Sequence, residues 1–448
     1  MNPCARDNLS GRKRVLNGYS PISREELFAY TNGHFLVDEQ RQLDRRYLNF
    51  DLDTLCDVAA SAGGDSSRIV TIEKLEGGFS KALLMKKGNG KEVIAKLPCR
   101  IAGPTSLTTA CEVGVLEYVR KYTSIPAPRV FSWSSDNSNP VGAEYIIMEK
   151  VAGVPLFEQW GKMAEIEKLE LIKNLTKLEA QLAAIRFPAY GGLYRQADVS
   201  SLQCQELNGS ICIGPSCGRS FSTDSAAVLS TQSEKLDYGP LSLIDFQSLS
   251  VLPLFLQAQW PVFLKPPQNY TKGLVQPKLP GDFDELDEEG KAAALQEWSQ
   301  SKLAKAYEVA TVLENGVAHN AMNIPRVFRE LFIRCGEVSE VGVVPLRECL
   351  IEIFRNWSSL GFTGQCPYSF SNEEITTHEH QFAEYQAWDE VQQLAQECLD
   401  TDAEGWIAPQ LDIEEKRRQN RELLSLYIKR MAGEKSPDEA RAMWPFPG

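Results

Sequence analysis

The chain has 448 residues, of which 43% are hydrophobic and 24% are charged, as is typical of a folded globular protein with more than one lobe. Acidic residues outnumber basic ones by 60 to 47, and the net charge of −13 without a Lys/Arg block argues against a nucleic-acid partner. The longest apolar stretch, residues 241–264, is broken by polar and Pro residues, so no membrane span is expected. The eleven cysteines show neither a CxxC pair nor the spacing of a disulfide framework, which indicates reduced thiols.

Residues 1–66 are predicted to form a polar N-terminal extension that ends in a helix and carries no chemical motif. Its first twenty residues contain four basic residues and one Asp, a composition only faintly similar to a transit peptide. No apolar helical face accompanies these basic residues. Composition alone therefore leaves both a mitochondrial and a cytoplasmic location open.

Residues 67–150 are predicted to form a small β-rich lobe. A helix is expected from about Ser106, because apolar residues recur there every four positions after a polar opening turn. Short β-type runs, separated by Gly-containing or polar turns, indicate strands. These runs are residues 69–75, 81–87, 92–98, 129–131 and 144–149.

Residues 151–448 are predicted to form a second, mainly helical lobe, which makes the fold class α+β. Apolar residues recur in this part at spacings of three and four, and Gly or Pro residues separate the periodic segments. The expected helices include residues 163–185, 302–313, 325–335, 345–357, 373–400 and 413–431.

Three features of the first lobe suggest phosphate chemistry when they are taken together. The Gly77-Gly78 pair between two strands could let backbone N–H groups approach a phosphate, although a plain hairpin is the commoner explanation. Lys96 lies on an apolar strand, and Glu112 follows sixteen residues later in the expected helix. A strand Lys paired with a helix Glu holds an ammonium over nucleotide phosphates in protein kinases. Taken singly, either residue is better explained by ordinary surface pairing.

The stretch EYIIMEKVAG, residues 144–153, is predicted to supply a strand and a hinge between the lobes. Backbone groups of such a hinge read an adenine ring, so Met148, Glu149 and Val151 are candidates by position rather than by side chain. Ser80, beside the glycine pair, completes the predicted nucleotide-binding set.

Several segments closely resemble fungal members of the aminoglycoside phosphotransferase family, and in particular the group named for altered inheritance of mitochondria. The likeness is dense over roughly residues 28–265 and loose beyond them. It implies a bilobal protein-kinase-like fold, ATP between the lobes and a mitochondrial location. The segments that carry it are EGGFSKALLM, GKEVIAKLP, IAGPTSLTTACEVGVLEYVR, TSIPAPRVFSWSSDNSNPVGAEYIIMEKVAGVPL, FPAYGGLY and ICIGPSCGRS.

The resemblance also implies a magnesium-binding Asp, and Asp245 is the candidate. The stretch LSLIDFQSLSVLPLF looks like the family's strand and turn with an I-D-W-Q-S element, here with Phe246 in place of Trp. A carboxylate at this place holds the metal that bridges the β- and γ-phosphates. A single Asp at a strand end is otherwise more often a cap or turn residue.

The family's catalytic HxDxxxxN loop is not found. None of the four histidines is followed two positions later by an Asp: His34, His319, His378 and His380. Gly214 and Asp245 lie only 31 positions apart, where the family has several dozen residues, so the C-lobe is predicted to be shortened between about residues 219 and 241. Asp224 and Asp237 lie within this interval as candidate substitute bases, but neither has a suitably placed Asn or basic neighbour.

The sequence therefore predicts an aminoglycoside phosphotransferase-family, kinase-like protein that binds nucleotide but is catalytically impaired, a pseudokinase. One alternative is an active ATP-dependent small-molecule phosphotransferase with a non-standard base. Another is a non-catalytic protein-interaction module that uses the helical C-terminal half. ATP and Mg²⁺ are the expected cofactors, and an unidentified small-molecule acceptor is the expected further partner of an active enzyme.

Overall fold

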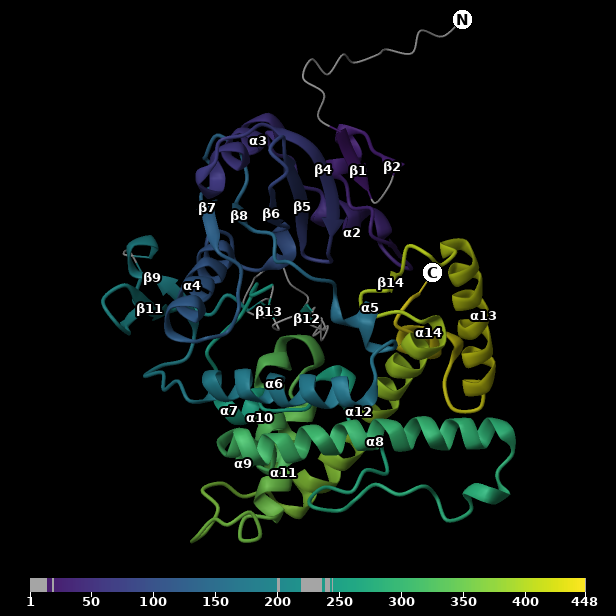
Figure 1. The fold of residues 1–448 in the computed structure, drawn as a ribbon. Helices are drawn as coiled ribbons and strands as arrows, with labels where there is room; N and C mark the ends of the chain where they lie inside the picture. Colours follow the sequence, from purple (N-terminus) through teal and green to yellow (C-terminus); the bar gives the residue numbers. More distant parts are fainter. Residues whose placement is uncertain are drawn as a thin grey trace, which may run out of the picture.

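The N-terminal part of the computed structural model is built on a seven-stranded sheet in the order β2-β1-β4-β5-β6-β8-β7 (Figure 1). The structure describes residues 14–17, 20–199, 202–218, 236–237, 242–243 and 245–447. All neighbouring strands of the sheet are antiparallel except β1 and β4. The strands are β1 (Arg14–Asn17), β2 (Ser20–Pro21), β4 (Ile69–Glu76), β5 (Ser80–Lys87), β6 (Glu92–Pro98), β7 (Val130–Ser134) and β8 (Tyr145–Glu149).

Buried residues alternate with more exposed ones along most of β5, whereas β8 is buried from Tyr145 to Met148. In β5, Leu83 and Met85 are fully buried, two positions apart. Gly90, with a φ of +85°, lies in the turn to β6, where the Lys87 N–H donates to the Lys91 carbonyl at 2.8 Å. The strands predicted between residues 69 and 149 are confirmed.

The residues before the sheet pack onto it instead of extending from it. Leu27 and Leu55 are fully buried in one core cluster with Ile72 and Leu83 of the sheet. Ser23 begins the first helix with a capping box, in which its hydroxyl and the Glu26 carboxylate bond each other's backbone N–H. The elements are α1 (Arg24–Phe28), β3 (His34–Phe35), α2 (Glu39–Arg46) and α3 (Leu52–Ser61).

The helix predicted after the third hairpin strand is α4 (Leu107–Tyr122). It contacts β7 and also β9 (Gly192–Arg195), which belongs to a small antiparallel sheet with β10 (Gln205–Glu206) and β11 (Ile211–Gly214). Figure 1 shows β9 and β11 of this small sheet beside α4. Helix α4 is therefore packed between two sheets.

Helices dominate the rest of the described chain, which confirms the α+β fold class and the predicted helical segments. Leu171, Ile172 and Leu175 of α6 share a core with Leu303 and Tyr307 of α8. The helices are α5 (Leu156–Trp160), α6 (Glu165–Ala183), α7 (Leu254–Gln257), α8 (Glu288–Glu314), α9 (Gly316–Met322), α10 (Arg326–Val341), α11 (Val344–Arg355), α12 (Asn372–Leu399), α13 (Ile413–Met431) and α14 (Pro437–Met443).

Short elements connect these parts. They are the 3₁₀ turns Ala62–Gly64, Arg100–Ala102, Gln196–Asp198, Val262–Leu264 and Phe283–Glu285, and the strand pair β12 (Leu236–Asp237) and β13 (Ser242–Leu243). The described cysteines form no disulfide, in agreement with their scattered positions. Among the described helices, none combines the length and the hydropathy that a membrane crossing requires.

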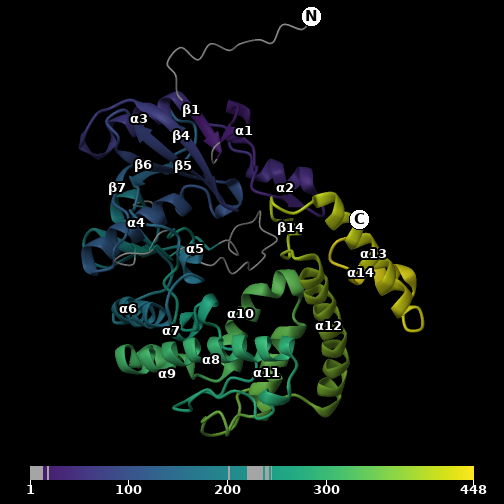
Figure 2. The same ribbon diagram turned by 45° about the vertical axis from the view of Figure 1, so that its right-hand side comes forward.

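The C-terminal segment, residues 400–447, returns to the N-terminal part of the chain. Its strand β14 (Trp406–Ile407) pairs antiparallel with β3. Leu36, next to β3, shares a core cluster with Leu399, Trp444 and Phe446. Figure 2 shows β14 between α2 of the N-terminal part and α12 of the helical part. The C-terminal segment therefore links the two parts of the molecule.

Candidate functional site

Lys96 and Glu112 form a buried ion pair. Lys96 lies on β6 between Ala82 of β5 and Ile146 of β8, so its backbone is held inside the sheet. Its Nζ donates to Glu112 Oε1 at 2.7 Å, and the two residues are only 4% and 3% exposed. An ammonium buried to this depth requires charged partners, because desolvation without them costs several kcal/mol or more. The strand Lys and the helix Glu thus meet as their order in the sequence suggested.

Asp245 joins this pair, although it lies 149 positions after Lys96. Its Oδ1 accepts from Lys96 Nζ at 2.6 Å, while its side chain is 50% exposed. Its φ of +67° is a left-handed conformation that Asp adopts more readily than most residues. The following residue, Phe246, is buried and donates its N–H to Glu112. Asp245 therefore contacts Lys96 and still presents part of its carboxylate to solvent.

The three charged groups control one another's ionisation. Burial lowers the pKa of Lys96, but the Glu112 and Asp245 carboxylates outweigh it, and the pKa of Lys96 is raised overall. Burial raises the pKa of Glu112, with Asp245 adding to this effect and Lys96 opposing it. Lys96 is thus held in the charged state that phosphate oxygens bind most strongly.

Glu144, which the sequence analysis did not single out, anchors the N-terminus of α4. Its buried carboxylate accepts from the Ser106 N–H at 2.8 Å and from Thr109 Oγ1 at 2.6 Å. Burial raises the pKa of Glu144, and the two donors oppose that rise. A carboxylate at a helix N-terminus also interacts favourably with the helix dipole. Glu144 thereby fixes the position of α4, and with it that of Glu112. The sequence signal that could have identified Glu144 is an acidic residue at the start of an apolar strand.

The Gly77-Gly78 pair forms the turn between β4 and β5. The Gly77 N–H donates to the Ser80 carbonyl at 3.1 Å, and Ser80 is opposite Pro98, two positions beyond Lys96 on β6. The turn therefore lies at the same end of the sheet as the C-terminal end of β6, two residues beyond Lys96. The Gly78 carbonyl accepts from Arg46 Nε at 3.2 Å. The sequence carries no signal for this contact, because a basic residue in a polar helix is usually exposed.

The predicted hinge begins at the end of β8. Met148 is buried opposite Ile94 of β6. The Glu149 N–H donates to the Arg129 carbonyl at 2.8 Å, and the Glu149 carboxylate accepts from the Arg129 N–H at 3.1 Å. Because the Glu149 N–H is thus engaged by Arg129, just before β7, we expect Val151, which follows β8, to be the better placed backbone contact for an adenine ring.

The residues around Asp245 fit a Mg²⁺ ion only if a bound nucleotide supplies most of the metal ligands. Over the described residues there is no group of three or more His, Cys, Asp or Glu side chains that could hold a metal by itself. The half-exposed Asp245 offers one carboxylate, and Mg²⁺ in nucleotide sites is commonly held by one or two carboxylates together with phosphates and water. The predicted assignment of Asp245 to Mg²⁺ stays a prediction.

The histidines lie in other parts of the fold. Their contacts are His34 with Glu39 at 2.8 Å, His319 with Asn323 at 3.1 Å and His378 with Glu348 at 2.8 Å, and His380 lies on α12. Most of the predicted shortened interval lies outside the described residues, Asp224 included. Asp237 belongs to β12 and pairs in register with Ser242 of β13.

Proteins of similar sequence are known. No protein-family model matches the chain. A subtelomeric hrmA-associated cluster protein of Aspergillus fumigatus is 26% identical over 492 aligned positions, which include 83% of this chain and 95% of that protein. Because 492 positions exceed the 448 residues of the chain, the relative has residues at positions where this chain has gaps.

Proteins named altered inheritance of mitochondria protein 9, mitochondrial, are also similar. The one from Yarrowia lipolytica is 24% identical over 210 residues, covering 43% of this chain and 36% of that protein. The one from Meyerozyma guilliermondii is 22% identical over 247 residues, covering 44% and 40%. The names describe these relatives as mitochondrial proteins.

Solved structures give weaker likenesses. A putative aminoglycoside phosphotransferase from Ralstonia eutropha is 13% identical with a TM-score of 0.35, over 70% of this chain and 98% of that one. A putative fructosamine-3-kinase from Haemophilus somnus is 12% identical with a TM-score of 0.30, over 60% and 97%. The strand order of the N-terminal sheet and the Lys96–Glu112 ion pair agree with a kinase-like fold. The chain is thus a sequence relative of the altered inheritance of mitochondria protein 9 group, with a bilobal kinase-like fold of the kind that the aminoglycoside phosphotransferase resemblance implied.

Proposed function

We propose that the chain binds a nucleoside triphosphate, ATP, together with Mg²⁺ between its lobes, and that it is impaired in phosphoryl transfer. The observation that carries this proposal is the cluster of Lys96 Nζ with Glu112 at 2.7 Å and Asp245 at 2.6 Å. Glu112 orients the ammonium, which contacts the phosphates, and Asp245 would hold the metal. Gly77, Gly78 and Ser80 would line the phosphates, and the backbone from Met148 to Val151 the adenine.

A metal at Asp245 would supply the positive charge that stabilises the β- and γ-phosphate oxygens. The chain's own residues fix Lys96 in its charged form and hold Asp245 beside it. The missing contribution is the general base, because the chain has no HxDxxxxN element. Base catalysis is typically worth about 10²–10⁴-fold in rate. Slow or absent turnover follows from this loss, even where the nucleotide is bound.

A second candidate is an active small-molecule phosphotransferase that uses Asp237 as base. The pairing of β12 with β13 brings the backbone of Asp237 opposite Ser242, three positions before Asp245. This neighbourhood is the observation that favours Asp237 for such a role. ADP formation that requires both Asp237 and Asp245 would support this candidate over the impaired form.

Thermal unfolding with increasing Mg-ATP tests nucleotide binding. A ligand that binds only the native state raises its stability, by about 2.7 kcal/mol at a hundredfold excess over Kd. We expect the melting temperature of the wild-type chain to rise with Mg-ATP and that of Asp245→Ala to stay constant. Asp65→Ala is the matched control, because it removes a half-exposed carboxylate that pairs with Lys91 far from the cluster. No rise in a cooperatively melting wild-type chain would reject the proposal and leave the protein-interaction alternative.

A further inference from the structure

The glycine turn is held from outside its own hairpin by Arg46. Besides its contact to the Gly78 carbonyl, Arg46 forms an ion pair with Glu404 of the C-terminal segment. The Arg46 side chain is 2% exposed, and its guanidinium carbon lies 4.6 Å from the centre of the Phe35 ring. Gln42 of the same helix accepts from Arg46 Nη1 through its side-chain oxygen at 2.7 Å. Arg46 thus joins the C-terminal segment to the turn through one fixed guanidinium.

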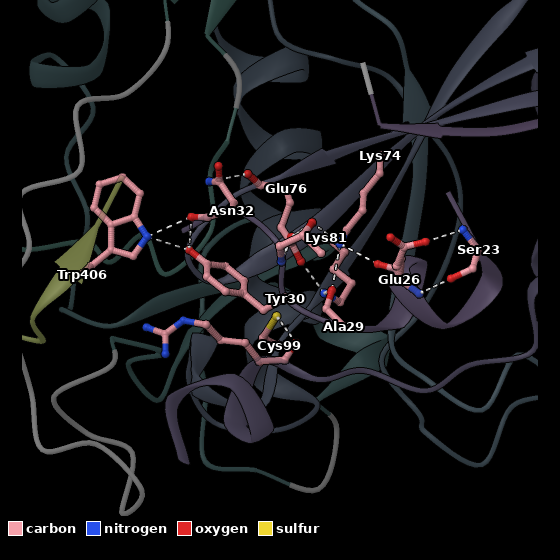
Figure 3. Close-up of polar contacts among 12 residues, drawn as sticks. Ser23, Glu26, Ala29, Tyr30, Asn32, Lys74, Glu76, Lys81, Cys99 and Trp406 are labelled. Atoms are coloured by element: carbon pink, nitrogen blue, oxygen red, sulfur yellow. Dashed lines mark hydrogen bonds and ion pairs between the residues drawn. The ribbon is translucent and has the colours of Figure 1, made fainter. Parts of the chain in front are cut away.

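A second route runs from Trp406 to the strand that enters the turn. Trp406 Nε1 donates to the Asn32 carbonyl at 2.9 Å and to the Tyr30 hydroxyl at 3.0 Å (Figure 3). Asn32 Nδ2 in turn donates to the carbonyl of Glu76, the last residue of β4. The two routes therefore reach the residues on either side of Gly77.

The residues between these routes are fixed by a buried ionic network. Lys74 and Lys81 both pair with the Glu76 carboxylate, and all three side chains are at most 4% exposed (Figure 3). Both ammonium groups also donate to the Ala29 carbonyl at 2.8 Å. These bonds hold residues 29–32 against β4 and β5. A displacement of Trp406 or Arg46 would therefore also displace the turn.

A turn of two glycines has more backbone freedom than any other pair of residues, so its conformation must be imposed by its surroundings. Arg46 is suited to this task, because a guanidinium has several donors in a rigid plane and stays charged when buried. Residues 402–407 begin shortly after α12 ends at Leu399, so the same contacts connect the Gly77-Gly78 turn of the N-terminal part to this long helix of the helical part.

We infer that residues 402–407 of the C-terminal segment hold the Gly77-Gly78 turn in its phosphate-binding conformation, with Arg46 as the positioning residue. This inference rests on the proposed nucleotide site. It predicts a selective effect, because ATP has phosphates for the turn to bind, whereas adenosine reaches only the hinge. Loss of the Glu404–Arg46 contact should lower the fraction of molecules with a competent turn and weaken ATP binding in proportion.

Calorimetric titration of the full chain with Mg-ATP and with adenosine tests this effect. In Glu404→Gln we expect the Kd of Mg-ATP to rise about five- to tenfold, because only a minority of molecules would then hold the turn in its phosphate-binding conformation. The Kd of adenosine should stay unchanged. Glu415→Gln is the matched control, because it removes a half-exposed carboxylate of the same segment that pairs only locally with Arg418. It should change neither affinity. An unchanged Kd for Mg-ATP in Glu404→Gln, or an equal loss for both ligands, would overturn the inference.

Hydrogen exchange without nucleotide gives a readout that does not depend on the proposed function. Amides of residues 77–80 should exchange faster in Glu404→Gln and in Arg46→Lys than in the wild-type chain, while those of β6 stay protected. Equal exchange in all chains would contradict the inference. If the wild-type chain binds neither ligand, the proposed function fails, and the exchange rates still decide whether the segment holds the turn.

Discussion

Lys96 faces two carboxylates, so the candidate site carries one excess negative charge before any ligand binds. Asp245 is the exposed member of the cluster, and Glu112 is buried. Nucleotide phosphates would add further negative charge beside Asp245, and this charge is best accommodated together with a divalent cation. The charge balance of these residues therefore favours Mg-nucleotide over free nucleotide.

Removal of Lys96 alone should be costly. In Lys96→Met the Glu112 carboxylate stays buried without its cation, and we expect the free energy of unfolding to fall by about 3–5 kcal/mol. The double variant Lys96→Met/Glu112→Leu should recover most of this loss, because both charges are then gone. Urea denaturation measures both values.

Lys91→Met provides the comparison for this prediction. Lys91 and its partner Asp65 are 60% and 52% exposed, so their separation should cost less than about 1 kcal/mol. Losses of similar size in Lys96→Met and Lys91→Met would show that the Lys96–Glu112 pair is not the buried, coupled pair described above.

Glu179 makes stability depend on pH. It lies on α6, accepts from the Tyr307 hydroxyl at 2.9 Å, and burial raises its pKa from 4.5 to about 7. The folded chain therefore keeps a proton that the unfolded chain releases, and the free energy of unfolding falls as the pH rises between about 4.5 and about 7. Glu179→Gln should remove up to about 3 kcal/mol of this fall.

Urea denaturation over this pH range checks the prediction. Glu165→Gln changes an exposed carboxylate on the same helix and should keep the wild-type dependence. The same pH dependence in Glu179→Gln as in the wild-type chain would contradict the raised pKa of Glu179.

At the scale of elements, the contact of α4 with β9 depends on Gly114. A Cβ at this position would lie 2.4 Å from the Leu193 carbonyl oxygen and 2.8 Å from the Tyr194 Cα. Because both are backbone atoms, α4 or β9 must shift, and Gly114→Ala should cost about 1–3 kcal/mol. Thermal or urea denaturation measures the loss.

Gly336→Ala is the matched control for Gly114→Ala. Gly336 is also inside a helix, but nothing lies within 4 Å of a Cβ built there. Since Ala is the better helix former, this change should stabilise the chain by up to about 1 kcal/mol. Equal effects of the two substitutions would contradict the close packing of α4 on β9.

The strands and the Lys–Glu pair could be predicted because their signals are local. Alternation marks β4, β5 and β6, and the positions of Lys96 and Glu112 follow from the order of strand and helix. The contact of Asp245 depends on a chain path that spacing does not encode, and only the family resemblance pointed to it. The pairing of β3 with β14 joins two-residue strands, which are too short to show any alternation.

The burial of residues 21–61 shows a different limit of the sequence. Their composition is polar, yet a few apolar side chains such as Leu27, Phe28 and Leu55 are enough to attach this stretch to the sheet. Arg46 is buried through partners that are distant in the sequence, above all Glu404. Polar residues satisfied by long-range contacts give no local pattern, so the sequence predicted an extension where the structure has a packed layer.

At the scale of the whole molecule, two segments of the described part of the chain run between the N-terminal sheet and the helical part. The first connection is the hinge after β8, and the second is the C-terminal segment that pairs β14 with β3. Two connections restrict how far the lobes can separate, since opening would have to break the strand pair or unpack Trp444 and Phe446 from Leu36. The nucleotide site proposed between the lobes therefore lies between the segment after β8 and the C-terminal segment.

The most direct test of the central claim is to incubate the purified chain with labelled Mg-ATP, remove free nucleotide by rapid gel filtration and identify what stays bound. We predict that nucleotide is retained and is recovered as ATP, because the proposed site binds it through Lys96, which Glu112 orients, and through a metal at Asp245, while the HxDxxxxN base is missing from the sequence. Failure of the wild-type chain to retain nucleotide would contradict the binding site, and recovery as ADP at a rate that depends on Asp245 would contradict the catalytic impairment.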